Sequence, residues 1–276
     1  MYRPLHRTHA IREAAFVIFG AEQIESSLIT AIGNDLTVPW RDVAPKRNDI
    51  QQFQIRLGPG PFPEVPPSLS APADAIEYVG LKANGELAWR VALNPGFIAI
   101  NCLVYPGWET VWPMVAGWLS WIMTRESVNA FPSSGIALQY INAFPWEGPL
   151  EECRPTQLLR PESADVPPSL YKLADDRWHL HSGRFVPLSE PYKGETLQRV
   201  HLGATRIDRP DGAKGSEAVI DVYHQSLFMP AVDISGDFVR GGHAEALYRT
   251  LHDLAKDRLA SYLCDRLIEE VNLYAS

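Results

Sequence analysis

Cysteine is scarce in this sequence, and the few cysteines form no recognisable pattern. The 276 residues include three, Cys102, Cys153 and Cys264, which lie far apart and in no C-x-x-C arrangement. An odd number of widely spaced cysteines predicts neither a disulfide framework nor a zinc knuckle. We therefore expect a protein of a reducing compartment.

Positive charge and long apolar runs are also in short supply. Aspartate and glutamate (33) outnumber lysine and arginine (25), which gives a formal net charge of −8. General nucleic-acid binding needs clustered positive charge, so this balance argues against it. No apolar window approaches the roughly 18 residues of a membrane-spanning helix, and residues 1–10 precede no secretion-signal core. We expect a cytoplasmic protein without a membrane segment.

The common catalytic signatures are missing as well. The chain has no G-x-S-x-G elbow, no Walker loop and no G-x-G-x-x-G after a predicted strand. This excludes the most frequent hydrolase, NTPase and dinucleotide-binding patterns. Two hypotheses from different classes stay open: a non-catalytic binding module without a cofactor, which we favour, and a metal-dependent enzyme.

The most informative stretch that is present is an alternating apolar run at residues 134–145. Its tyrosine and isoleucine residues and the closing Pro145 predict a buried strand. The polar residues within it are Gln139 and Asn142, and the amide of Asn142 needs hydrogen-bond partners if the strand is buried. We interpret this strand as the start of a second structural half, which divides the chain into residues 1–130 and 131–276.

Both halves show the same predicted order of elements. The first half has a strand at 14–20, a helix at 21–32, a proline-rich connection at 57–72, strands at 76–83, 87–93 and 97–103, and a helix at 108–122. The second half has the strand at 134–145, an irregular stretch, strands at 178–188, 196–207 and 217–228, and a long helix at 243–271.

This order of elements predicts an α+β fold, because runs of strands followed by a helix do not form alternating βαβ crossovers. We expect two similar halves, each an antiparallel sheet covered by a long helix, fused into a platform with pseudo-two-fold symmetry. One large continuous sheet is the alternative.

Two short turn sequences in the first half predict how its strands reverse. Asn84-Gly85 predicts a type I′ hairpin turn, because both residues tolerate positive φ. Asn94-Pro95-Gly96 predicts a type II turn in which Gly96 is left-handed. These turns make the three central strands an antiparallel meander.

Tryptophan is concentrated in the predicted helix at 108–122, at Trp108, Trp112, Trp118 and Trp121. Such residues could form a platform for a sugar or a nucleobase. Aromatic residues at helical spacing more often pack a core, and we favour that interpretation.

Histidine offers the one candidate metal site. His179 and His181 share a face of a predicted strand, since strand side chains repeat every two residues. His201 and His224 lie on the next two predicted strands. If the strand register brings the four rings together, they could bind zinc or another divalent metal. Hydrogen-bonded or surface histidines are the favoured alternative, because no H-E-x-x-H motif accompanies them.

One carboxylate lies between apolar residues, where a charge is costly if it is buried. Asp221 follows Ile220 and precedes Val222 on the last predicted strand. It either faces water or pairs with Arg199 or Arg206 on the preceding strand.

A set of short motifs resembles a family of sporadically distributed bacterial proteins of similar length and uncharacterised function. The motifs are Gly85 before an apolar strand, Asn94-Pro95, Tyr105-Pro106-Gly107-Trp108-Glu109, Gly135-Ile136-Ala137-Leu138-Gln139-Tyr140-Ile141-Asn142, Ala218-Val219-Ile220-Asp221-Val222, and the closing leucine-rich segment with His252. The family usually has Arg-Tyr-Ile-Asn where this chain has Gln139-Tyr140-Ile141-Asn142.

The resemblance spans most of the chain and implies no activity. Its patchy distribution suggests mobile gene clusters of the defence or toxin type. On the binding hypothesis the partner is a protein, and the candidate contact residues are Gln139, Tyr140, Asn142 and Trp108.

Overall fold

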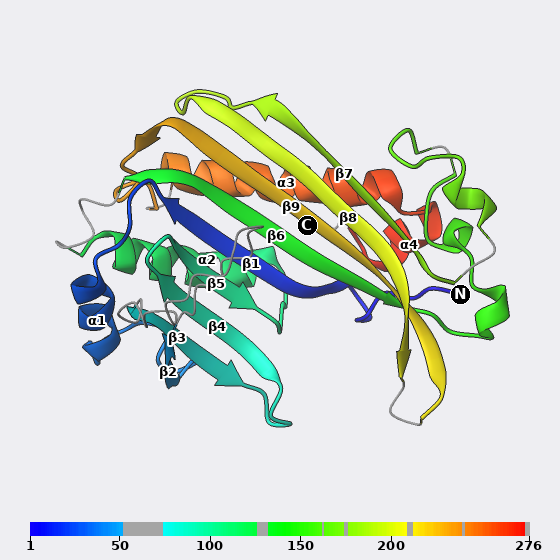
Figure 1. Ribbon diagram of the computed structural model, residues 1–276, viewed down its shortest axis with the longest axis horizontal. Coiled ribbons are helices and arrows are strands. Elements are labelled where there is room, and N and C mark those ends of the chain that lie inside the picture. Colours follow the sequence, from blue (N-terminus) through cyan, green and yellow to red (C-terminus); the bar gives the residue numbers. More distant parts are fainter. Residues whose placement is uncertain are drawn as a thin grey trace, which may run out of the picture.

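The computed structural model describes the chain except for residues 52–73, 126–131, 162, 174–175, 209–211, 239–240 and 274–276. Within the described ranges, nine antiparallel strands form one continuous sheet in the order β2-β3-β4-β5-β1-β6-β9-β8-β7 (Figure 1). The strands are β1 (Ile11–Gly20), β2 (Lys46–Gln51), β3 (Asp74–Leu81), β4 (Leu87–Asn94), β5 (Phe97–Cys102), β6 (Ser133–Pro145), β7 (Trp178–Pro187), β8 (Gly194–Asp208) and β9 (Lys214–Val232).

Two long helices cover one face of this sheet. The helices are α1 (Ser26–Asn34), α2 (Trp108–Met123), α3 (His243–Tyr262) and α4 (Asp265–Glu270), with short 3-10 turns η1 (Leu150–Glu152), η2 (Pro155–Gln157) and η3 (Leu170–Lys172). In Figure 1, α2 and α3 both lie behind the strands. Across the described ranges, every helix is too short or too polar to span a lipid bilayer.

The prediction of two sheets, each covered by its own helix, is wrong. Strands β1 and β6 pair antiparallel at the centre, with Phe16 opposite Leu138, so residues 1–130 and 131–276 share one sheet. Outward from this pair, β5 follows β1 and β9 follows β6. The pairing satisfies backbone N–H and C=O groups that two separate sheets would leave exposed along their edges.

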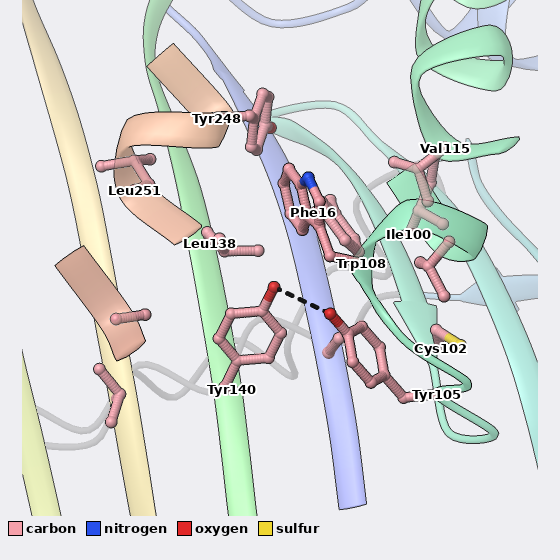
Figure 2. Close-up of a cluster of buried hydrophobic side chains, with 14 of the residues drawn as sticks. Phe16, Ile100, Cys102, Tyr105, Trp108, Val115, Leu138, Tyr140, Tyr248 and Leu251 are labelled. Atoms are coloured by element: carbon pink, nitrogen blue, oxygen red, sulfur yellow. Dashed lines mark hydrogen bonds between the residues drawn. The ribbon is translucent and has the colours of Figure 1, made fainter. Parts of the chain in front are cut away.

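Helix α3 also connects the two halves. Its Tyr248 hydroxyl donates a hydrogen bond of 2.8 Å to the carbonyl oxygen of Val17 on β1. The ring centroids of Tyr248 and Phe16 are 6.0 Å apart (Figure 2). Phe16 also packs against Trp108 and Trp112 of α2. Both long helices therefore share one core over the central strands.

The individual strand predictions are confirmed with small shifts of their boundaries. The predicted meander strands correspond to β3, β4 and β5, and the last three predicted strands to β7, β8 and β9. Strand β2 was not predicted, because its sequence KRNDIQ is largely polar. The proline-rich connection predicted at 57–72 lies outside the described residues.

The closing helix predicted at 243–271 is in fact two helices. Helix α3 ends at Tyr262, and Leu263 forms a β-bridge with Leu159 before α4 begins. The carbonyl of Tyr262 accepts a hydrogen bond of 2.7 Å from the amide of Arg160. Pairing with a distant segment thus interrupts a stripe of apolar residues that is regular in the sequence.

Both predicted turn types are also wrong in detail. Gly85 has φ of 84°, but Asn84 does not have positive φ. The amide of Gly85 binds the carbonyl of Lys82, and the amide of Lys82 binds the carbonyl of Glu86. This is the pattern of a type I turn followed by a left-handed glycine bulge. Gly96 does not have positive φ either, so the second turn is not of type II.

The tryptophan-rich helix is part of the core, as the favoured interpretation predicted. Trp108, Trp112 and Trp118 of α2 are at most 7% exposed. Trp118 packs edge-on against Trp89 of β4, with the ring centroids 5.1 Å apart. These three rings therefore fill the space between α2 and the sheet and are not exposed as a platform for a sugar or base.

Candidate functional site

Strand β6 divides the predicted contact residues between the two faces of the sheet. Successive strand residues point to opposite faces. Tyr140 and Asn142 therefore lie on the helix-covered face and are buried, while Gln139 lies on the other face and is half-buried. We name this second face the open face; it carries the odd-numbered residues of β1 and of β5 to β9.

On the helix-covered face, Tyr140 belongs to a buried aromatic cluster. Its hydroxyl lies 2.9 Å from Nδ1 of His252 on α3 and 3.5 Å from the hydroxyl of Tyr105, the contact drawn in Figure 2. The ring of Trp108 stacks on the ring of His252, with centroids 4.2 Å apart and planes within 8°. The strand motif, the Trp108 motif and the last long helix thus meet at this cluster.

The electrostatics of this cluster favour a structural role. Burial raises the pKa of the Tyr140 hydroxyl well above its ordinary value. Burial, followed by the nearby charges of Lys256 and Arg249, lowers the pKa of His252 to about 4. Both groups are therefore neutral near pH 7, and their pKa values lie far from that pH, whereas efficient general acid–base catalysis needs a pKa near the working pH.

A small cavity adjoins the cluster. It has a volume of about 50 Å³ and is lined in part by His9, Tyr140, Asn142, His252 and Lys256. This space suits an ordered water molecule and falls well below the roughly 300 Å³ of a typical ligand pocket.

The amide of Asn142 has the partners that its burial requires. Its Nδ2 donates a hydrogen bond of 3.2 Å to the carbonyl oxygen of Ile220 on β9. The side chain is 1% exposed. The prediction that Asn142 is an ordered, hydrogen-bonded strand residue is confirmed.

The open face presents a different kind of surface, in which polar side chains stand side by side across several strands. Gln139 of β6 lies opposite Tyr223 of β9, which lies opposite Arg199 of β8. In the next row, Ile141 lies opposite Asp221, which lies opposite His201. These side chains form an unbroken surface because β6, β9 and β8 are neighbouring strands of the sheet.

Side chains on the open face hold one another in place. Nε2 of Gln139 donates a hydrogen bond of 2.8 Å to Oδ1 of Asp221. The guanidinium of Arg199 lies 4.3 Å from the ring centroid of Tyr223, which is cation–π geometry. The Tyr223 hydroxyl donates to Oε1 of Gln225 at 2.9 Å. The surface is therefore ordered before any partner binds.

Charges of both signs alternate across this face. Arg90 pairs with Glu77, and Arg12 pairs with Glu217. Nδ2 of Asn101 donates a hydrogen bond of 2.6 Å to Glu13. The exposed carboxylates and guanidinium groups neutralise one another, so no positive stripe runs across the described part of the open face.

One end of the open face is apolar. Phe185 of the edge strand β7 is 59% exposed. It lies opposite Leu197 of β8, which lies opposite Gln225 of β9. A large exposed aromatic side chain beside ordered polar groups is a feature of protein-binding surfaces.

The four histidines of the predicted metal site do not gather. His179, His181 and His201 lie on the open face, and the rings of His181 and His201 are 5.7 Å apart. His224 lies opposite Gln198 on the helix-covered face and is fully buried. Among the residues that the structure describes, no group of three His, Cys, Asp or Glu side chains could hold a metal ion.

Asp221 lies half-buried on the open face, which agrees with the first of the two alternatives in the sequence analysis, but that analysis did not identify its neighbours as a surface. Arg206 instead binds Asp176 through two hydrogen bonds of 2.8 and 3.0 Å. The partner of Asp221 is Gln139. The signal that was overlooked is the alternation of polar residues at Asp221, Tyr223 and Gln225, which places all three on one face of β9.

A scan against models of known protein families finds no match, and a search of the curated proteins finds none either.

Proposed function

We propose that this chain is a non-catalytic binding protein that holds a protein partner on the open face of its sheet. The observation that carries the proposal is the row Gln139–Tyr223–Arg199 across three strands of the open face. Contacts among side chains of this face hold the row in place, and exposed Phe185 lies on the same face nearby. Tyrosine and arginine are the residues that most often dominate binding energy at protein interfaces. A surface ordered in advance also loses little side-chain entropy on binding.

Charge supports a protein partner over a nucleic acid. The ion pairs Arg90–Glu77 and Arg12–Glu217 place opposite charges side by side on this face. The chain as a whole carries a formal charge of −8. Phosphate backbones require unpaired lysine and arginine, whereas protein surfaces complement mixed charge.

The pKa values of the buried cluster support binding over catalysis, because burial moves both of them away from neutral pH. Tyr140 and His252 are held neutral near pH 7 by burial. The metal-enzyme alternative loses its structural support, because its four histidines lie on both faces of the sheet: His179, His181, His201 and His224. The proposed binding function uses no cofactor.

The proposed setting is the bacterial cytoplasm, in a mobile gene cluster of the defence or toxin type. The resemblance of the motifs to a sporadically distributed bacterial family supports the cluster. The free thiols of Cys102, Cys153 and Cys264 are compatible with a reducing compartment. The identity of the neighbouring genes tests the cluster directly.

Site-specific photocrosslinking tests the proposed surface. A photoreactive phenylalanine analogue replaces Tyr223 in the full-length protein, expressed in its native host. We expect one reproducible crosslinked protein, identified by mass spectrometry. The matched control carries the analogue at Asp253, which is exposed on α3.

A second variant links the crosslink to the open face. Arg199→Glu reverses the charge beside position 223 and should suppress the crosslink. Equal crosslinking from positions 223 and 253, or none from 223, would contradict the proposal.

A further inference from the structure

A second pocket lies on the helix-covered side, between the turn that joins β7 to β8 and the first half of α3. Its volume is about 400 Å³, within the range of small-molecule sites. The walls are largely apolar and include Val186, Pro187, Leu188, Leu247, Leu251 and Leu254. This pocket is separate from the open face and from the Tyr140 cluster.

The floor of the pocket is polar, which is unusual for the buried face of a sheet. Thr196 and Gln198 line it and are 4% and 5% exposed. They lie opposite Ser226 and His224 of β9. The hydroxyls of Thr196 and Ser226 are 3.2 Å apart and satisfy each other.

Gln198 has a donor that the described protein leaves unused. Nε of Arg184 donates a hydrogen bond of 3.0 Å to Oε1 of Gln198, which fixes the orientation of the amide. No described residue accepts a hydrogen bond from its Nε2. Nε2 is not among the fully buried atoms that lack a partner, so it is reachable from the pocket, where solvent or a ligand oxygen can accept its hydrogen bond.

A neighbouring side chain is also unsatisfied. By strict hydrogen-bond geometry neither ring nitrogen of His224, across the ladder from Gln198, has a partner among the described residues, although the Leu254 backbone lies close enough to favour the protonated ring. Two adjacent polar side chains are thus held beneath an apolar pocket without full hydrogen bonding. An apolar core at this position would be more stable, so stability alone does not explain these residues.

We propose that this pocket binds a small molecule with an apolar body and one carbonyl or carboxylate group. The ligand oxygen accepts a hydrogen bond from Nε2 of Gln198. Its carbon chain contacts Leu247, Leu251 and Leu254. The guanidinium of Arg184, which already binds the Gln198 amide, adds a positive charge beside the polar end.

Titration with octanoate and with octanamide, followed by calorimetry on the full-length protein, tests this site. The two probes share an apolar chain and a carbonyl oxygen, and they differ in charge. We expect saturable binding of at least one probe with one site per chain. A preference for octanoate that Arg184→Gln removes identifies the ligand as a carboxylate; a preference for octanamide identifies a neutral carbonyl compound.

Three variants locate the binding. Ala246→Trp fills the pocket from an exposed position of α3, and we expect it to weaken binding at least tenfold. Asp253→Trp places the same side chain on α3 outside the residues that line the pocket and should leave binding unchanged. Gln198→Leu removes the Nε2 donor together with the Oε1 acceptor of Arg184, and it should weaken binding about threefold to tenfold.

The proposal is overturned if neither probe gives saturable binding. It is also overturned if Ala246→Trp and Asp253→Trp bind equally well. Circular dichroism of each variant shows that it is folded before titration, so that a loss of affinity reports on the pocket.

Discussion

The hydroxyl of Tyr140 lies 2.9 Å from Nδ1 of His252, and this contact joins the central strand β6 to helix α3. The same hydroxyl lies 3.5 Å from that of Tyr105, which precedes α2. One buried polar group thus connects the sheet to segments of both halves.

Removal of the Tyr140 hydroxyl should destabilise the protein. Tyr140→Phe leaves the imidazole of His252 without its partner inside the core, so we expect a loss of about 1 to 3 kcal/mol in the free energy of unfolding. Urea denaturation measures this loss. Tyr223→Phe, which removes a hydroxyl from the open face, is the control and should cost less. Equal losses in the free energy of unfolding for the two variants would show that the buried contact stabilises the protein no more than the exposed one.

Stability should fall as the pH falls from 6.5 to 4. Burial, with the guanidinium of Arg258 nearby, lowers the pKa of His224 to about 4, and burial lowers that of His252 to the same value. Between these pH values the unfolded chain binds more protons than the folded protein, so acid favours unfolding. The loss from His224 is about 2 to 3 kcal/mol by pH 4, and that from the less buried His252 is smaller.

Replacement of His224 measures how much of the pH dependence of stability comes from this buried ring. His224→Leu should flatten the decline in stability, measured by urea denaturation at pH 7 and pH 4.5. His181→Gln alters an exposed ring and serves as the control. An unchanged decline in His224→Leu would contradict the assignment of this proton uptake to His224.

Arginine at position 139 should form an ion pair on the open face. Gln139 already donates to Asp221 at 2.8 Å, so a longer cationic side chain at this position can reach the same carboxylate. We expect Gln139→Arg to fold and to couple to Asp221 by about 0.5 to 1 kcal/mol, weaker at high salt. A double-mutant cycle with Asp221→Asn measures the coupling. A coupling energy of zero would mean that the guanidinium points elsewhere.

Gly80 should not tolerate a side chain. A Cβ atom there would lie 1.8 Å from the carbonyl oxygen of Val43, which is backbone and cannot move aside easily. Gly80→Ala should therefore cost about 1 to 3 kcal/mol or more. Gly96→Ala is the matched control, since no atom lies within 4 Å and φ is ordinary. We expect that variant to be neutral or slightly stabilising, and thermal denaturation compares the two.

Helix α3 should be essential to the fold. Leu251 is fully buried, so Leu251→Ala should cost about 2 to 5 kcal/mol. Thr250→Ala, at the preceding position, which is exposed, should change stability by less than about 0.5 kcal/mol. Truncation after residue 242 would expose the sheet face beneath the helix and should give insoluble or molten protein. A truncated protein that melts cooperatively near the full-length temperature would show that α3 is an appendage.

Local patterns in the sequence determined most of the strands, the long helix α2 and the need of Asn142 for a hydrogen bond. Alternation of apolar and polar residues predicted β3 to β5 and β7 to β9, because side-chain period depends only on neighbouring residues. The tryptophan spacing predicted the buried face of α2 for the same reason. Asn142 needed a hydrogen bond wherever its strand lay, since burial of an unpaired amide is costly.

Tertiary structure alone decided how these elements combine. The pairing of β1 with β6 joins two expected sheets into one, and it depends on backbone groups that every strand offers equally. The opposition of Gln139, Tyr223 and Arg199, and the placement of His224 on the other face, depend on the register between strands. The contact of Tyr140 with His252 spans 112 residues. No local pattern encodes such distances, because the free energy that selects them comes from the packing of the whole core.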